Sequence, residues 1–120
     1  MRGKFGEAGE LFFEIELIAS DGISLPTEAL LDTGFTGGIA VNNQDAQSLG
    51  WIALDEIYMS TARGLANFTT YFEKVCFAGE EFEVEILSGN GIPDVLTGLA
   101  WLRTRRLVVD LPLNVLTLGE

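Results

Sequence analysis

The chain has 120 residues, 48% of them hydrophobic and 21% charged, so it is long enough for one globular domain with its own core. Its 7 basic and 18 acidic residues give a formal net charge of -11, which repels nucleic acids and anionic membrane surfaces. The absence of histidine excludes Ser-His, Cys-His and histidine-metal sites, and leaves Asp, Glu, Lys, Tyr and Cys as chemical groups. We therefore expect no nucleic-acid partner.

Apolar and polar side chains alternate along much of the chain, which is typical of β-strands with one solvated face. Short segments such as Asp21-Gly22 and Ala78-Gly79-Glu80 separate neighbouring strands in the manner of hairpin turns. The expected strands cover residues 11–18, 23–31, 71–77, 82–86, 107–111 and 115–118.

Only two short segments suit helices. Asn42 or Asn43 can cap a turn or two over residues 44–49, which Gly50 ends. The second covers residues 99–103, and we expect the arginines at 103, 105 and 106 to be solvated charges at its end, with an anion site as the alternative. The sequence thus predicts a mainly β protein with a single domain over residues 1–120. Residues 1–9 are compatible with a loose N-terminal segment.

Neither a targeting signal nor a membrane span is evident. Residues 1–7 contain basic side chains and then acids, without the apolar stretch of a signal peptide, and no apolar run reaches the length of a membrane helix. The single Cys76 cannot form an internal disulfide, and between Val75 and Phe77 it is expected to be a small buried hydrophobe. We expect a soluble cytoplasmic protein with no membrane partner.

The most informative segment is an apolar strand that runs directly into an acid. Residues 29–31 precede Asp32-Thr33-Gly34, and a second apolar strand over 39–41 follows a glycine-rich turn. An Asp at the end of a buried strand is costly unless something uses or satisfies its charge. Asp32 is therefore the leading candidate for a catalytic carboxylate.

This segment and its surroundings resemble the retropepsin-like aspartic proteases, the single-domain retroviral type and its small bacterial relatives. The signature of that family, two apolar residues followed by Asp-Thr-Gly at the end of a strand, matches Leu30-Leu31-Asp32-Thr33-Gly34. The resemblance extends in order of elements over residues 11–118. It includes a hairpin over 57–71 that is similar to the family's flap, and Leu96-Thr97-Gly98, which stands where the family has two apolar residues and Gly before a short helix.

The resemblance implies a closed β-barrel of the acid-protease type, with one or two short helices and one lobe per chain. A single Asp-Thr-Gly supplies one carboxylate, whereas water-mediated hydrolysis of an amide by carboxylates needs two, one as base and one protonated. A twofold homodimer supplies the second carboxylate from the partner chain. Two Asp32 carboxylates that lie close together cannot both be ionised, so they share one proton. The implied function is an aspartic endopeptidase acting on a polypeptide substrate, with no metal and no cofactor.

The resemblance also implies roles for the neighbours of Asp32. The Thr33 hydroxyl reaches across the dimer axis to the partner's backbone, with a plain turn hydroxyl as the alternative. Gly34 allows close backbone approach and backbone dihedrals that a side chain forbids, and its amide bonds the carboxylate. Phe35 stands where most members have Ala or Ser, so it either fills part of a substrate pocket or packs in the barrel.

Two further segments complete the implied site. Ala62, Arg63 and Gly64 form the flap tip, which excludes water and bonds the substrate backbone, with an ordinary exposed hairpin as the alternative. Leu96, Thr97 and Gly98 support the Asp32 loop from beneath, although Thr97 replaces an apolar residue. The C-terminal strand over 115–118 matches the use of terminal strands in the family's dimer interface.

Other functions and other acids remain open. The rival function is a non-catalytic dimerisation or peptide-binding module of the same fold. A third interpretation, an unrelated small barrel with a chance Asp-Thr-Gly, predicts a monomer with Asp32 exposed. Asp94 is expected to be a turn residue and Asp110 a strand-end acid paired with Arg105 or Arg106. The glutamates at 14, 16, 81, 83 and 85 are expected to form a solvated face rather than a metal site.

Overall fold

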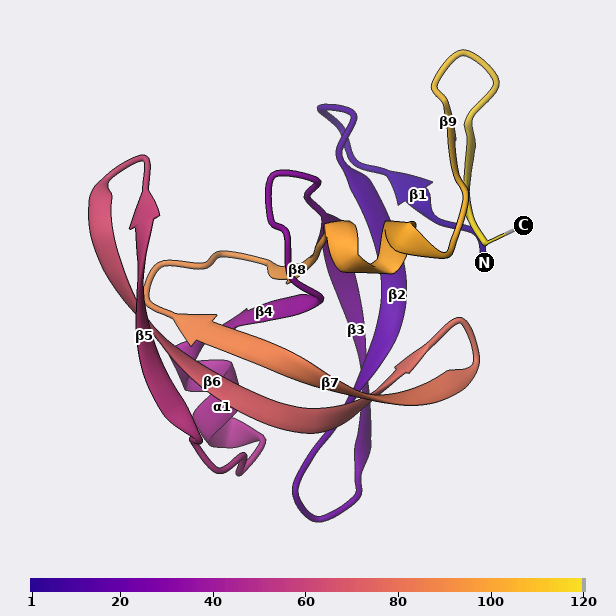
Figure 1. Cartoon of the computed structure of the whole chain (residues 1–120). Coiled ribbons are helices and arrows are strands. Elements are labelled where there is room, and N and C mark those ends of the chain that lie inside the picture. The colour runs from indigo at the N-terminus through magenta and orange to yellow at the C-terminus, as the bar shows by residue number, and fades with distance from the viewer. Residues whose placement is uncertain (120) are drawn as a thin grey trace.

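The computed structural model describes residues 1–119 as ten strands, one α-helix and one 3-10 helix (Figure 1). The strands are β1 (Lys4–Phe5), β2 (Leu11–Ile18), β3 (Ser24–Leu31), β4 (Ile39–Asn42), β5 (Asp55–Thr61), β6 (Gly64–Phe77), β7 (Glu80–Gly89), β8 (Val95–Thr97), β9 (Leu107–Asp110) and β10 (Val115–Leu118). The helices are α1 (Asn43–Ser48) and the 3-10 helix η1 (Leu99–Arg103). No helix among the described residues is long and apolar enough to cross a membrane.

Six of these strands form a closed barrel. β2, β3, β8, β4, β7 and β6 are neighbours in that order, and the pairing of β2 with β6 closes the ring. β1 and β5 extend the sheet beyond the ring, and β9 pairs only with β10 in a separate two-stranded sheet. The mainly β barrel expected from the sequence is confirmed.

The alternating pattern of β2 shows how the sequence builds the barrel. Phe13, Ile15 and Leu17 are buried while Glu14 is exposed, so one face of the strand enters the core and the other meets solvent. The antiparallel partner β3 begins after the predicted Asp21-Gly22 turn. Burial of each large apolar side chain contributes about 1.5–3 kcal/mol, which is why this alternation determines the strand's orientation.

Both predicted helices are present, and their lengths follow from local contacts. The Asn42 side chain accepts a hydrogen bond from the Asp45 amide at 2.7 Å and begins α1. Gly50 follows the helix with φ of 73°, the left-handed conformation expected at its end. The second helix, η1, is a single 3-10 segment rather than an α-helix. It lies directly after β8, where it covers the loop that follows β3 (Figure 1).

The N-terminal residues, which the sequence left open as a loose segment, are attached to the barrel. β1 pairs with β2, and the Gly3 amide donates to Leu116 O at 2.9 Å. The Leu118 amide likewise donates to Met1 O at 2.9 Å, so the first residues join β2 to β10. This attachment links segments more than a hundred residues apart, and therefore has no local sequence signal.

Asp110 has a different partner from the one predicted. Its Oδ1 accepts the Leu113 amide at 3.1 Å within the β9–β10 turn. The expected ion pair with Arg105 or Arg106 is not formed among residues 1–119. A carboxylate that satisfies a turn amide stabilises the hairpin without a cationic partner.

Candidate active site

Asp32 lies at the point where two strands of the barrel end side by side. It directly follows β3, and β3 pairs in parallel with β8 so that Leu31 is opposite Thr97. The Asp32 amide donates to Thr97 O at 2.9 Å. Because parallel strands end at the same edge, this pairing brings Asp32 together with the Leu96-Thr97-Gly98 segment.

The Asp32 carboxylate is exposed, and one of its oxygens has a backbone donor. The Gly34 amide donates to Oδ1 at 2.9 Å, as the resemblance implied. Of the two reasons expected for Gly34, unusual dihedrals do not apply, because its φ lies outside the left-handed region that favours glycine. Glycine is favoured there by space instead, since a Cβ would lie 3.1 Å from Oδ1 of Asp32. The turn thus orients the carboxylate and leaves it accessible.

The loop over residues 32–38 rests on the backbone that begins η1. The Leu99 amide donates to Phe35 O at 2.8 Å, and the Gly98 amide donates to Gly38 O at 2.9 Å. A Cβ on Gly98 would collide with Gly37 O and lie 2.6 Å from Phe35 O. Only glycine allows this close approach of two backbones. The loop carrying Asp32 is therefore held from beneath by main-chain contacts.

Phe35 is half-buried, whereas Thr33 is exposed. The half-buried Phe35 ring packs against the loop's own backbone, where a Cβ on Gly37 would lie 2.7 Å from Cζ of the ring and one on Gly98 would lie 2.7 Å from Cδ2. These contacts are with the loop and Gly98 rather than with the barrel core, and a role of Phe35 in a substrate pocket stays a prediction. The Thr33 side chain is exposed and makes no hydrogen bond to any described residue.

Thr97 replaces an apolar residue without leaving an unsatisfied hydroxyl. Its side chain is only 1% exposed, and Oγ1 donates to Leu30 O at 3.5 Å. No buried side-chain nitrogen or oxygen among the described residues lacks a hydrogen-bond partner. The departure from the family pattern is therefore accommodated between β3 and β8.

The predicted flap segment is an antiparallel hairpin. Strands β5 and β6 pair from Asp55 opposite Thr70 to the turn at Ala62 and Arg63. Gly64 follows with φ of 102°, a conformation that other residues rarely adopt. All three tip residues, Ala62, Arg63 and Gly64, are exposed. Figure 1 shows the tip and the 32–38 loop at the same end of the molecule, on separate elements.

The other candidate groups lie outside the Asp32 loop. Cys76 is half-buried rather than buried, and desolvation together with nearby Glu16 and Glu81 raises the pKa of its thiol. Desolvation, followed by repulsion from Glu83, also raises the pKa of Glu73. Among residues 1–119, no cluster of three or more Cys, Asp or Glu side chains is arranged to hold a metal ion. Asp94 is exposed in the bend before β8.

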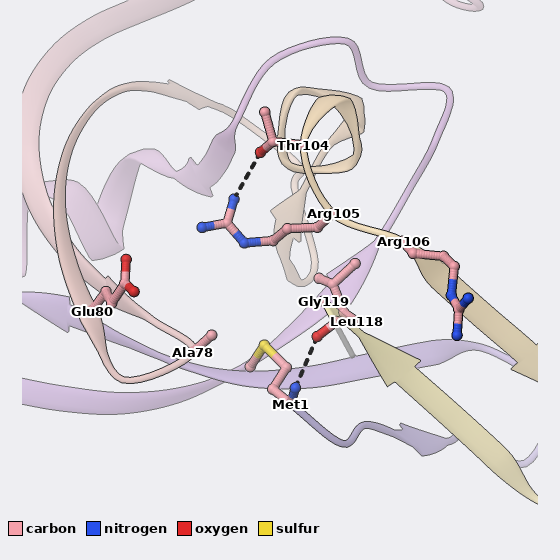
Figure 2. Close-up of a pocket in the computed structure, with 8 residues that line it drawn as sticks. All are labelled: Met1, Ala78, Glu80, Thr104, Arg105, Arg106, Leu118 and Gly119. Atoms are coloured by element: carbon pink, nitrogen blue, oxygen red, sulfur yellow. Dashed lines mark hydrogen bonds between the residues drawn. The ribbon is translucent and has the colours of Figure 1, made fainter.

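A hollow of about 570 Å³ lies beside the arginine cluster (Figure 2). In Figure 2 the Arg105 side chain points toward the side of the hollow where Glu80 lies, and Arg106 points the other way. The Arg105 guanidinium lies 5.2–5.5 Å from three aromatic ring centroids, those of Phe77, Phe82 and Trp101. This packing was not predicted, because Trp101 is far along the chain from the two phenylalanines. The arginines do not converge on a common anion.

Comparisons with known proteins identify the fold. No family model matches the chain, and no curated protein matches it. The crystal structure of a retropepsin-like aspartic protease from Rickettsia conorii is similar, with a TM-score of 0.68 and 21% sequence identity over 98% of this chain and 88% of that one. At this identity the likeness concerns the fold. The chain has the retropepsin-like fold, with one barrel lobe and Asp32 at the end of β3.

Proposed function

We propose that the protein is an aspartic endopeptidase, in which Asp32 from each of two subunits forms the catalytic pair. The observation that carries the proposal is the position of Asp32. It is an exposed carboxylate at the end of a barrel strand, held by the Gly34 amide, in a chain of the retropepsin-like fold. The similar Rickettsia protein is itself named an aspartic protease, which supports the same chemistry here.

The chemistry requires a second carboxylate that one chain does not supply. Among the acids in apolar settings, Asp94 lies in an exposed bend and Asp110 is the last residue of β9, so both are outside the Asp32 loop. A twofold axis beside the loop places a second Asp32 opposite the first. The exposure of Asp32 in the single chain is compatible with this arrangement, because a second subunit would cover the same face.

In this mechanism the two carboxylates share one proton. The ionised one takes a proton from a water molecule while the protonated one polarises the scissile carbonyl, and the water oxygen forms a bond to the carbonyl carbon. The C–N bond then breaks as the amine nitrogen takes up the proton that the first carboxylate removed from the water, which restores the pair with one shared proton. The Gly34 amide orients Oδ1 of each carboxylate, and the β5–β6 hairpin covers the substrate as a flap.

The rate should decrease as the pH rises. The pair works with one proton between two carboxylates, so loss of that proton removes the acid. The formal charge of -11 per chain adds repulsion between subunits at higher pH. The proposed activity therefore belongs to the acidic range, and a rate that kept rising through neutral pH would argue against a shared proton.

The direct test compares the wild-type chain with Asp32→Asn on an unbiased peptide mixture from about pH 3 to pH 7. Asparagine keeps the shape and removes the acid, so cleavage should fall by about 10²-fold or more at equal dimer content. Asp94→Asn, which removes an exposed acid outside the loop, is the matched control and should cleave as the wild type does. If neither wild type nor variant cleaves while both are dimers, the peptide-binding module becomes the better explanation of the fold.

A further inference from the structure

We infer that Trp101 is a positioning residue, whose indole N–H holds the loop that carries Asp32. Its Nε1 donates to Gly38 O at 3.0 Å, across 63 residues of chain. Gly38 is the last residue of the 32–38 loop, immediately before β4. The catalytic part of this inference rests on the proposed function, whereas the effect on the loop does not.

The indole is fixed by its surroundings. Trp101 is 6% exposed and stacks on Phe77 with ring centroids 4.0 Å apart and an interplanar angle of 3°. Phe82 contacts it edge-on at 5.3 Å, and the Arg105 guanidinium lies 5.3 Å from its centroid. Stacked and edge-on aromatic pairs restrict ring rotation. The N–H therefore points at the loop from a rigid base that includes the end of β6.

Two donors from the same segment hold the Gly38 carbonyl. The Gly98 amide donates to it at 2.9 Å and the Trp101 indole at 3.0 Å. One bond leaves a peptide unit free to pivot about that contact, whereas two donors also fix the direction of the carbonyl. The other end of the loop is held by the Asp32 amide on Thr97 O. Loss of the indole bond should therefore loosen the loop without leaving a buried carbonyl unpaired.

This restraint matters for catalysis because the chemistry depends on position. Two carboxylates must lie within hydrogen-bond reach of one water molecule, and a displacement of about 1 Å can lower a rate by about 10²-fold. Trp101 does not touch the substrate in this mechanism. It acts through Gly38 on the placement of Asp32, so its removal should affect kcat more than KM.

Trp51 provides a matched control within the same chain. It is 7% exposed, and its Nε1 donates to a backbone carbonyl, Ile18 O, at 2.9 Å. That bond joins the segment after α1 to the end of β2 and has no part in the 32–38 loop. Trp51→Phe and Trp101→Phe therefore remove the same kind of buried hydrogen bond at two different places.

The experiment measures native-state amide exchange of residues 33–38, together with kcat and KM on one peptide, for both variants. Both should lose similar stability. In Trp101→Phe alone, the Gly34 and Phe35 amides should exchange about threefold to tenfold faster, and kcat should fall by about tenfold with KM little changed. Phe82→Leu replaces Trp101→Phe as the test if the latter does not fold. It keeps the indole and removes its edge contact, and should show a smaller change in the same direction.

Equal effects of the two Trp variants on loop exchange, or wild-type loop exchange in Trp101→Phe, would overturn the inference. The exchange measurement needs no activity. If the wild type does not cleave peptides but loop exchange is faster in Trp101→Phe alone, the proposed function is overturned and the positioning role is supported.

Discussion

At the scale of single residues, the groups that hydrogen-bond Asp32 directly belong to the main chain of other residues. The Gly34 amide donates to the Asp32 carboxylate, and the Asp32 amide donates to Thr97 O. The charge of Asp32 is therefore separable from the structure of its loop. Substitution of Gly98 should disturb the loop, while Asp32→Asn should leave it intact.

Gly98→Ala tests how closely the two backbones must approach. A Cβ at this position collides with Gly37 O and crowds Phe35 O, both of them main-chain atoms that cannot rotate away. We expect the free energy of unfolding to decrease by about 2 kcal/mol, measured by urea denaturation. Gly38→Ala is the control, because its Cβ would lie 3.6 Å from the Trp101 indole nitrogen, an ordinary contact. Equal losses in the two variants would show that the close approach at Gly98 is not the cause.

At the scale of elements, features that arise from neighbouring residues were predictable. The alternation in β2 and the Asn42 cap of α1 each involve a few adjacent positions. The Asp-Thr-Gly segment is local in the same sense, whereas the β5–β6 hairpin was located through its resemblance to the family's flap. The bonds from Trp101 to Gly38 and from Leu118 to Met1 join distant segments, so no local pattern reveals them. At Gly34 the sequence offers two reasons for glycine, dihedral freedom and space, and only the structure shows that space is the relevant one.

The flap role of the β5–β6 hairpin can be tested with two equivalent glycines. Gly64 and Gly79 have φ of 102° and 81°, and a Cβ added at either residue would have no atom within 4 Å. Alanine at either site should cost about 1–2 kcal/mol of stability because of the left-handed backbone. Only Gly64→Ala should also lower kcat/KM, by about tenfold, because it distorts the tip that covers the substrate. Peptide cleavage that responds equally to both substitutions would remove the flap assignment.

At the scale of the whole molecule, one chain presents half of the proposed site. In Figure 1 the 32–38 loop lies between the β5–β6 tip at the upper left and the β9–β10 turn at the upper right. The last of these exposes Leu111 and Leu113 at 56% and 73%. Exposed apolar side chains that lie close together are typical of a surface that another protein covers. The proposed dimer would cover this surface as it brings the second Asp32 to the first.

Subunit mixing tests the shared catalytic pair most directly. Wild-type and Asp32→Asn chains are combined in equal amounts at constant total concentration, and exchange of subunits is verified by the mass of a tagged copy. If each active site needs Asp32 from both chains, only wild-type homodimers cleave, and activity falls to about a quarter of the all-wild-type value. Activity of about half, after complete exchange, would mean that each chain acts alone and would contradict the shared pair.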